Sequence, residues 1–285
     1  MARALVVGEV LWDRFPDSAR LGGAPLNFAV HFQRLGHTPM LVSAVGADAA
    51  GDNAKLAIQR FGLDVTFLQS TVRFNTGSAT IRVGPAGQPA FTIVRPAAYD
   101  AVALSDAEFE QISASNPSWV YYGTLFPHGP DGRRTLDRLL AQLPGATRFY
   151  DLNLRPGVDD PALVADLLRA AHVVKLNDEE MMFVSRLTGL PADRGGFCRE
   201  GRRRYGWRAV AVTLGERGCA MIVGDDYVEA GGIAVEVVDT VGAGDAFAAA
   251  LVHGLASGWQ AATIADAANR AGAAIAAIEG AMPVR

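Results

Sequence analysis

The chain has 285 residues, half of them hydrophobic, which is enough for a large core. Its formal net charge of −4 gives no overall attraction to nucleic acid or to an anionic membrane. No apolar run is long enough to span a bilayer, the two cysteines form no CxxC pair, and the first residues lack a signal-peptide pattern, so a cytoplasmic protein is expected.

Short apolar runs alternate with helical patterns along the chain. Strands are predicted at residues 4–8, 40–46, 119–123, 148–153, 172–177 and 208–215, and helices at 25–36, 51–62, 135–143 and 161–170. Two last helices, 244–257 and 260–279, are rich in alanine and apolar nearly all round, so both are expected to be buried. This alternation predicts an α/β fold with a mostly parallel central sheet and helices on both faces.

Two stretches, 10–22 and 76–95, break this rhythm. The second predicts a hairpin of SATIRV, a Gly/Pro turn and AFTIV. Strands inserted into an α/β core usually project from it, so we predict a small β-sheet lid from about residues 10–20 and 76–98, within a single domain of residues 1–285. The free edges of such a sheet would favour pairing into a homodimer.

Residues 239–251 read DTVGAGDAFAAAL and place Gly242 and Gly244 where a helix begins. The first N–H groups of a helix lack partners within it, and the helix dipole adds partial positive charge, so this turn suits an anion. Two interpretations of Asp245 then remain. It caps the helix, or it takes the proton of an alcohol that attacks a phosphate held by the N–H groups near Ala243 and Gly244.

Motifs of several other enzyme classes are absent from the sequence. It contains no GxxxxGK[ST] P-loop, no GxGxxG after the first strand and no GxSxG, which disfavours P-loop NTPases, NAD-dependent oxidoreductases and serine hydrolases. The five histidines are scattered and form no zinc-binding pattern. The arginine run at 199–208 is interpreted as a solvated helix end and not as a nucleic-acid site.

The stretch DTVGAGDAF closely resembles the C-terminal signature of the PfkB, or ribokinase-like, family of carbohydrate kinases. Further motifs follow in the family's order: LGGAPLNFAVHFQRLG (21–36), VGADAAGD (45–52), YDLNLRP (150–156), KLNDEE (175–180) and TLGERG (213–218). The resemblance covers most of the chain. It implies a three-layer sandwich with a lid, and ATP-dependent phosphorylation of a sugar hydroxyl.

The resemblance also implies roles for residues around the sugar. The sugar would be held by Asp13, Gly23, Asn27, Asn153, Arg155 and Asp245. Asp245 would be the general base, the turn Gly242–Ala243–Gly244 would stabilise the transferred phosphoryl group, and Arg155 would contact the sugar or that group. The alternative interpretation is an exposed turn for Asp13, an incidental amide for Asn27 and a surface ion pair for Arg155.

Nucleotide and metal sites are implied in the same way. The nucleotide would be contacted by Asn177, Thr213, Gly215, Gly218, Gly242, Gly244 and Asn269. Glu180 would hold Mg²⁺ through water, and a possible K⁺ would lie beside Asp239, Thr240 and Gly280. Tight-turn glycines, a first-turn glutamate and a core amide at Asn269 are the alternatives.

The stretches GEVLWDRFPD, LGGAPLNFAVH and YDLNLRPG look most like the fructokinase branch, which phosphorylates the 6-hydroxyl of fructose. A 2-keto-3-deoxygluconate kinase and a ribose or nucleoside kinase are the alternatives within the family. A sugar- or nucleotide-binding protein without catalysis is the alternative from another class.

Overall fold

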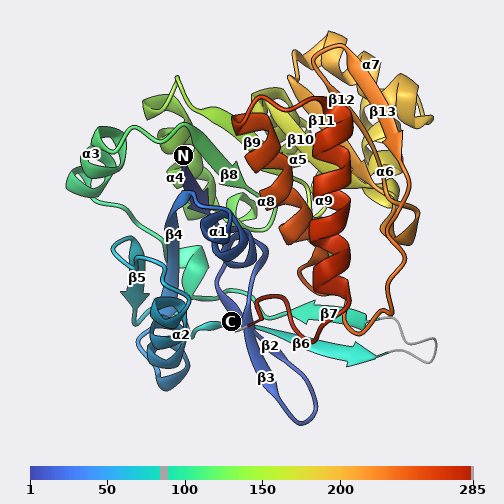
Figure 1. The fold of residues 1–285 in the computed structure, drawn as a ribbon. Coiled ribbons are helices and arrows are strands. Elements are labelled where there is room, and N and C mark those ends of the chain that lie inside the picture. Colours follow the sequence, from blue (N-terminus) through green and yellow to red (C-terminus); the bar gives the residue numbers. More distant parts are fainter. Residues whose placement is uncertain (84–88, 284–285) are drawn as a thin grey trace.

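A large, mostly parallel sheet forms the centre of the computed structural model, which describes residues 1–83 and 89–283 (Figure 1). Its strand order within these residues is β13-β12-β11-β10-β9-β8-β1-β4-β5. The strands are β1 (Arg3–Val7), β4 (Thr38–Gly46), β5 (Leu68–Thr71), β8 (Trp119–Tyr122), β9 (Thr147–Asp151), β10 (Val173–Asn177), β11 (Ala209–Thr213), β12 (Cys219–Val223) and β13 (Asp226–Ala230). The antiparallel pairs are β11–β12 and β12–β13, at one end of the sheet.

The apolar strands are buried on both faces, as a covered parallel sheet requires. In β1, Leu5 and Val7 belong to one core, while Ala4 and Val6 belong to the other. Because successive side chains point to opposite faces, a continuous apolar run supplies two cores at once.

Helices cover each face of the sheet. On one face lie α1 (Ala24–Arg34), α2 (Ala49–Arg60), α8 (Ala243–Ala256) and α9 (Ala261–Ala276). On the other lie α3 (Asp106–Ala114), α4 (Pro130–Gln142), α5 (Pro161–Ala170), α6 (Asp178–Thr188) and α7 (Arg194–Tyr205). Short 3-10 helices span Ala98–Ala101, Phe126–His128 and Gly215–Arg217. The predicted three-layer α/β sandwich is therefore confirmed.

A second, smaller sheet lies beside one end of this sandwich (Figure 1). Its order is β3-β2-β6-β7, from β2 (Leu11–Arg14), β3 (Ala19–Gly22), β6 (Gly77–Val83) and β7 (Pro89–Ile93). Strands β2 and β6 pair in parallel, while β6 and β7 form an antiparallel hairpin. The Gly/Pro turn predicted between these two strands falls on residues 84–88, which lie outside the described residues.

The prediction that both alanine-rich helices are buried is correct for α8 and wrong for α9. In α8, all residues from Asp245 to Val252 are buried. In α9, Ile264, Ala265 and Ala268 face the core, whereas Ala262 and Asp266 are exposed. Alanine has so little side chain that exposing it costs little, so an alanine-rich pattern does not require burial on all sides.

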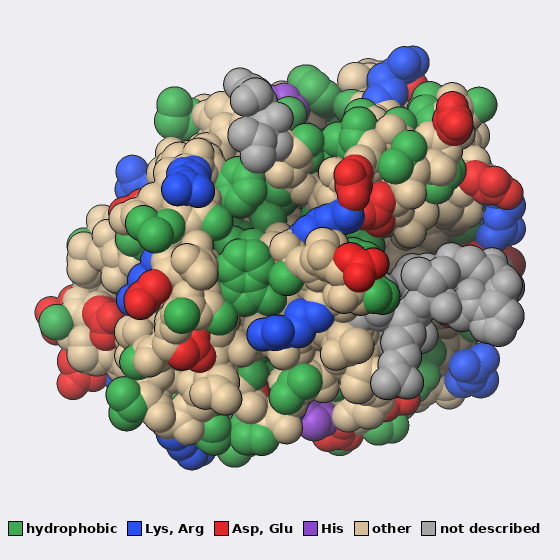
Figure 2. Space-filling view, turned by 90° about the horizontal axis from the view of Figure 1, so that it is seen from below, with side chains coloured by type: hydrophobic (Ala, Val, Ile, Leu, Met, Phe, Trp, Pro, Cys, Tyr) green, Lys and Arg blue, Asp and Glu red, His purple; other side chains and the backbone are tan. Residues whose placement is uncertain are grey.

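The surface seen from the small-sheet side carries acidic and basic side chains interspersed, with neither sign gathered into one patch (Figure 2). None of the helices within residues 1–83 and 89–283 is both long and apolar enough to cross a bilayer. The arginines at the end of α7 make surface ion pairs, such as Arg202 with Asp225 and Arg203 with Glu200, as a solvated helix end would.

Candidate active site

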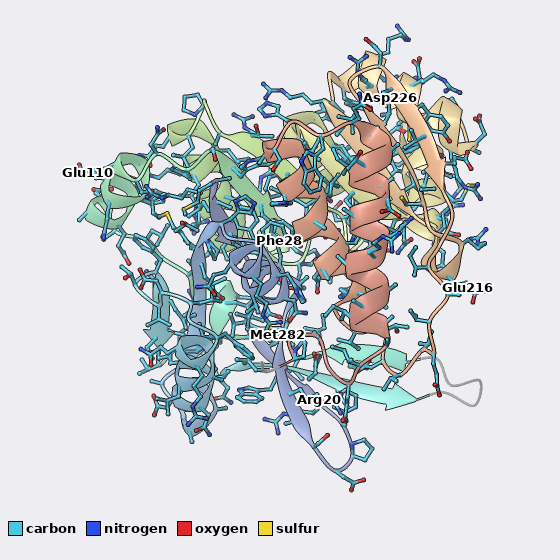
Figure 3. All side chains as sticks on the ribbon, viewed as in Figure 1. Arg20, Phe28, Glu110, Glu216, Asp226 and Met282 are labelled. Atoms are coloured by element: carbon cyan, nitrogen blue, oxygen red, sulfur yellow. The ribbon has the colours of Figure 1, made fainter. Side chains whose placement is uncertain are left out.

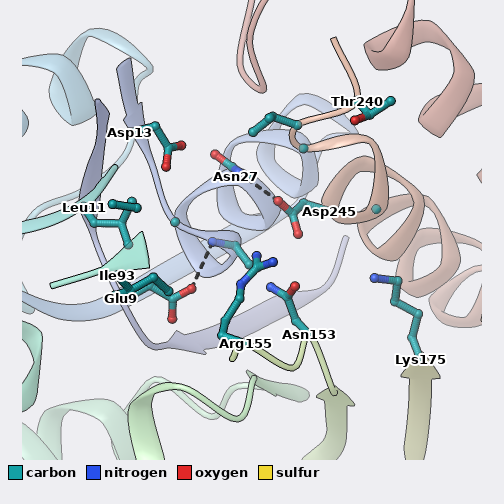
Figure 4. Close-up of a pocket in the computed structure, with 16 residues that line it drawn as sticks. Glu9, Leu11, Asp13, Asn27, Ile93, Asn153, Arg155, Lys175, Thr240 and Asp245 are labelled. Carbon is teal, nitrogen blue, oxygen red and sulfur yellow. Dashed lines mark hydrogen bonds between the residues drawn. The ribbon is translucent and has the colours of Figure 1, made fainter. Parts of the chain in front are cut away.

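A cavity of about 210 Å³ lies between the small sheet and the carboxyl ends of the central strands (Figure 4). Ligands of open α/β sheets bind at this edge. The cavity is lined by Glu9, Leu11, Asp13, Gly23, Ala24, Asn27, Ala79, Ile93, Asn153, Arg155, Lys175, Thr240, Val241, Gly242, Gly244 and Asp245. The structure thus brings together all the residues that the sequence assigned to the sugar, together with most of the glycine turn.

Asp245 lies in the first turn of α8 and faces this cavity. Gly242 occupies the N-cap position with a φ of 81°, and no side chain caps the helix. The carboxylate of Asp245 instead accepts a hydrogen bond of 2.8 Å from the amide of Asn27 on α1. Asp245 is therefore not the cap of its own helix, and its carboxyl group is directed at the cavity.

The environment of Asp245 suits a base. Burial raises the pKa of its carboxyl group to about 6, although the positive charge of Lys175 opposes the shift. A group with this pKa is mostly ionised at neutral pH, yet it accepts a proton more readily than an exposed aspartate does.

The first turn of α1 forms another wall of the cavity. Gly23, the N-cap of α1, has a φ of 111°, and a Cβ there would lie 2.5 Å from the carbonyl oxygen of Glu9. The Oε1 atom of Glu9 accepts a hydrogen bond of 3.2 Å from the N–H of Ala24. The Oδ1 atom of Asn27 is buried and has no hydrogen-bond partner among the described residues, which leaves it available for a ligand hydroxyl.

Two further carboxyl groups face the same cavity. Burial raises the pKa of Glu9 to about 7 and that of Asp13 to about 6, while the charge of Arg155 opposes both shifts. Carboxyl groups beside a guanidinium offer several donors and acceptors at fixed positions, which is the requirement for binding a compound with many hydroxyls.

Asn153 and Arg155 reach the cavity from the segment after β9. Asn153 has a φ of 44°, a left-handed conformation that asparagine tolerates better than most residues. In Figure 4, Arg155 lies between Glu9 and Asp245, so its guanidinium is near the centre of the lining.

Asn177 and Glu180 lie at the junction of β10 and α6, outside the cavity lining, and form a capping box. The side chain of Asn177 accepts from the N–H of Glu180 at 2.8 Å, and Glu180 accepts from the N–H of Asn177 at 2.8 Å. The other carboxylate oxygen of Glu180 accepts from the N–H of Leu154 at 2.7 Å. Glu180 is thus a fixed, buried carboxylate at the end of two neighbouring strands.

The remaining nucleotide candidates gather around the β11–β12 turn and also lie outside the cavity lining. Thr213 at the end of β11 pairs with Asn177 at the end of β10. Gly218 has a φ of 92°, and a Cβ there would lie 2.1 Å from the carbonyl oxygen of Ala230. Asn269 donates to the carbonyls of Ala230 and Gly231, at 3.4 and 3.1 Å. Gly215 begins the 3-10 helix of this turn.

The loop that precedes α8 holds the candidate cation residues. Asp239 accepts from Arg20 at 3.0 Å, from the N–H of Gly280 at 3.1 Å and from the N–H of Val241 at 3.0 Å. Both carboxylate oxygens therefore already have donors, one of them a guanidinium. Thr240 lines the cavity, whereas Asp239 and Gly280 do not.

Sequence reasoning did not assign two charged residues of the lining. Glu9 occurs in the quoted stretch GEVLWD, but only Asp13 was singled out there. Lys175 opens the motif KLNDEE, and its place in a strand gave no sign that its side chain reaches the α8 turn. The available signal was the lysine itself, since a lysine within the apolar strand VVKLN, which is buried from Val173 to Leu176, needs a buried partner.

The known proteins that share this fold and sequence are carbohydrate kinases. The pfkB family of carbohydrate kinases matches residues 16–284. A fructokinase of Salmonella typhimurium is 30% identical over 269 residues, covering 90% of this chain and 85% of the relative. The aminoimidazole riboside kinase of Salmonella typhimurium strain LT2 is 29% identical over 307 residues, covering 99% of this chain and 91% of the relative.

Solved structures give the same result. The fructokinase of Vibrio cholerae O395, in its fructose, ADP and calcium ion bound form, has a TM-score of 0.82 and 27% identity, and the match covers 100% of this chain and 96% of the other. A double mutant of that fructokinase, in a fructose, ADP and potassium ion bound form, has a TM-score of 0.83. The chain belongs to the pfkB family of carbohydrate kinases and is an ATP-dependent enzyme of that class.

Proposed function

We propose that this kinase transfers the γ-phosphate of ATP to the 6-hydroxyl of fructose, with Asp245 as the general base. The main support is the position of Asp245. It is buried in the first turn of α8, accepts a hydrogen bond from Asn27 on α1, and faces a polar cavity. A base and an anion-binding turn must be neighbours in this reaction, because the nucleophile attacks the phosphorus that the turn stabilises.

In this proposal, different residues of the cavity activate the hydroxyl, bind the phosphoryl group and hold the sugar. Asp245 accepts the proton of the attacking hydroxyl, and the backbone N–H groups near Ala243 and Gly244 bind the phosphoryl oxygens. The sugar is held by Asp13, Gly23, Asn27, Asn153 and Arg155. Asn27 is only 3% exposed to solvent, and its buried Oδ1 atom has no hydrogen-bond partner among the described residues. A sugar hydroxyl that donates to this atom would satisfy it, which supports the role of Asn27 in holding the sugar.

The residues fit a Mg²⁺ ion that arrives with ATP. No cluster of three or more His, Cys, Asp or Glu side chains suited to a metal occurs in the described part of the chain. Mg²⁺ keeps several waters and takes few protein ligands beside phosphates, and the fixed carboxylate of Glu180 fits a contact through water. The ion would offset the negative charge of the phosphates. The nucleotide is assigned to the region of Asn177, Thr213, Gly215, Gly218 and Asn269.

The residues do not fit a K⁺ ion held by Asp239. The guanidinium of Arg20 and two backbone N–H groups already bind that carboxylate, and a second cation beside Arg20 would be repelled. No K⁺ ion is therefore proposed at Asp239, although a potassium ion bound form of the Vibrio cholerae fructokinase double mutant exists.

The substitution Asp245→Asn tests the mechanism. It keeps the size of the side chain and a hydrogen-bonding group near Asn27, but removes the base. We expect binding of fructose and Mg·ATP within about threefold of the unaltered protein, and kcat lower by about 10²–10⁴-fold. Calorimetric titration and ADP release measure the two quantities. Near-normal turnover would rule out Asp245 as the base.

A substrate panel tests the sugar. ADP release would be measured with fructose, glucose, ribose, 2-keto-3-deoxygluconate, adenosine and aminoimidazole riboside. The last compound is included because a relative named for it covers 99% of this chain. The proposal expects the highest kcat/KM with fructose. Fast turnover of another compound would keep the mechanism and replace the substrate, whereas ATP binding without turnover would indicate a binding protein.

We also propose that the small sheet closes over the sugar and that its free edges pair two chains into a homodimer, as edge strands can do. Sedimentation velocity would test the dimer, and a monomer at micromolar concentration would contradict it. Cys198 and Cys219 are free and buried, which suits the reducing cytoplasm where we place the reaction.

A further inference from the structure

A buried lysine lies against the glycine turn of the cavity. The sequence contains only two lysines, Lys55 and Lys175, although it is rich in arginine. Lys175, on β10, is 8% exposed and lines the cavity together with Gly244 and Asp245. Its Nζ atom is 3.1 Å from the position that a Cβ on Gly244 would occupy, so the amine rests on the bare backbone of that turn.

Neighbouring strands hold this amine in place. The register of β9 and β10 sets Asp151 opposite Lys175, and the two carboxylate oxygens accept from Nζ at 2.9 and 3.2 Å. The hydroxyl of Tyr121 on β8 donates to the same carboxylate at 3.1 Å. Asp151 is fully buried and Tyr121 nearly so. The amine therefore has one fixed position, beside the turn and at the edge of the cavity (Figure 4).

We propose that Lys175 is a further catalytic residue, whose ammonium group contacts the phosphoryl group in transfer, and that Asp151 and Tyr121 are positioning residues that hold it there. The proposal rests on the kinase function proposed above. The bound group is chemically a phosphate, so the partner of Lys175 is the γ-phosphate of ATP and, after transfer, the phosphate of the product.

The placement of the charge supports this role over a purely structural one. A buried ion pair adds little net stability, because desolvating two charges costs about as much as their attraction returns. Burial alone would favour the neutral amine, but the carboxylates of Asp151, Asp245 and Glu180 outweigh it and hold the pKa of Lys175 above its usual value. An ammonium group that stays charged at neutral pH, and that lies beside an anion-binding turn, can stabilise the negative charge on a phosphoryl group during transfer.

The chemical step balances without any further reactant. The hydroxyl oxygen of the sugar forms a bond to the γ-phosphorus, and the bond from that phosphorus to the bridging oxygen of ADP breaks with its electron pair. The hydroxyl proton goes to Asp245. Lys175 keeps its proton throughout and stabilises the negative charge on the equatorial oxygens, as a pre-positioned donor does.

Kinetics of three variants provide the first test. Lys175→Met alone leaves Asp151 buried without a counter-charge, which destabilises the fold, so Asp151→Asn/Lys175→Met removes both charges together. Lys55→Met, on the partly exposed side of α2, is the matched control. We expect kcat to fall about 10²–10³-fold in the double variant, with the KM for fructose changed less than about threefold and Lys55→Met unaffected.

The double variant decides between the two roles of the ion pair. A folded double variant whose kcat is within threefold of the unaltered protein would overturn the proposal, because the pair would then be structural only. Tyr121→Phe should give a smaller loss of kcat than the removal of Lys175, again without a change in the KM for fructose. A rise in KM with unchanged kcat would contradict a positioning role for Tyr121.

A binding experiment tests Lys175 without turnover. In NMR spectra, protein labelled with ¹³C at the Cε atom of lysine gives two signals, one from Lys55 and one from Lys175. The variant Lys55→Arg removes one signal and thereby assigns the other to Lys175. Mg·ADP with aluminium fluoride mimics the planar phosphoryl group, and its addition should shift the Lys175 signal more than Mg·ADP alone does, while the Lys55 signal stays unchanged. If Mg·ADP alone shifted the Lys175 signal as far as Mg·ADP with aluminium fluoride does, the proposal would be overturned. This experiment requires no reaction with a sugar. Its result therefore stays valid even if the substrate panel shows that fructose is not the substrate.

Discussion

The carboxyl group of Asp245 makes a clear prediction for the pH dependence of the reaction. The general base must be ionised, and burial raises its pKa to about 6. The base is therefore active above that pH and is lost as the pH falls through it. We expect kcat/KM for fructose to decline below about pH 6, approaching tenfold per pH unit. A pH profile that stays flat to pH 5 would contradict the assignment of Asp245.

Glu9 makes a prediction for stability. Its Oε1 atom is the buried acceptor for the N–H of Ala24. Glu9→Ala leaves that N–H without a partner and should lower the free energy of unfolding by about 1–3 kcal/mol. Glu9→Gln keeps an acceptor oxygen at the same place and should lower it much less. Urea unfolding measures both, and equal losses in the two variants would show that the hydrogen bond is not the cause.

The sequence could predict single residues of the site only where a motif singled them out. Asn27 and Asp245 are 218 positions apart, and the hydrogen bond between them follows from the packing of α1 against α8, not from local pattern. Glu9 and Lys175 were missed for the same reason. A charged residue within an apolar strand signals a buried partner, but the partner becomes visible only when the neighbouring strands are in register.

At the scale of elements, β3 connects the small sheet to the loop before α8. Arg20 on β3 binds Asp239 and also Glu279, near the end of α9 (Figure 3). This guanidinium supplies the positive charge that a K⁺ ion would bring to Asp239. We therefore expect equal activity in KCl and in tetramethylammonium chloride at one ionic strength. Arg20→Gln should lose activity, and K⁺ should restore part of it.

The matched control is Arg14→Gln, on the neighbouring strand β2 and exposed to solvent. It should behave like the unaltered protein in both salts. An unaltered enzyme that requires K⁺ would show that Arg20 does not replace the ion, whatever the behaviour of the variants.

Elements with a strong apolar period were predictable, whereas others were not. The strands β1 and β4 and the helices α1 and α2 were found within a few residues of their ends. Of helix α7, only the arginine-rich end was predicted, because RGGFCREGRRRY has no continuous apolar stripe. Its place is set by the N-cap Asp193 and by the packing of Phe197 against Trp207, a contact of 6.3 Å between ring centroids. Such a helix depends on tertiary packing more than on propensity.

At the scale of the whole molecule, the cavity joins two separate sheets. Leu11 and Asp13 come from the small sheet, and Gly242 and Asp245 come from the sandwich. A sugar bound between them binds the folded chain and not the unfolded one. Fructose at about 100 times its Kd should therefore stabilise the fold by about 2.7 kcal/mol. For a chain of this size, that corresponds to a rise in Tm of about 5–10 °C.

Two variants separate binding from chemistry in this measurement. Asp245→Asn should keep the rise in Tm, because the base is needed for transfer more than for holding the sugar. Asp13→Ala should lose most of it, since its carboxyl group comes from the small sheet and would bind the hydroxyls there. Hydrogen exchange in β2 and β6 should slow when fructose is added to the unaltered protein. Unchanged exchange in these strands, with fructose bound, would show that the small sheet does not close over the sugar.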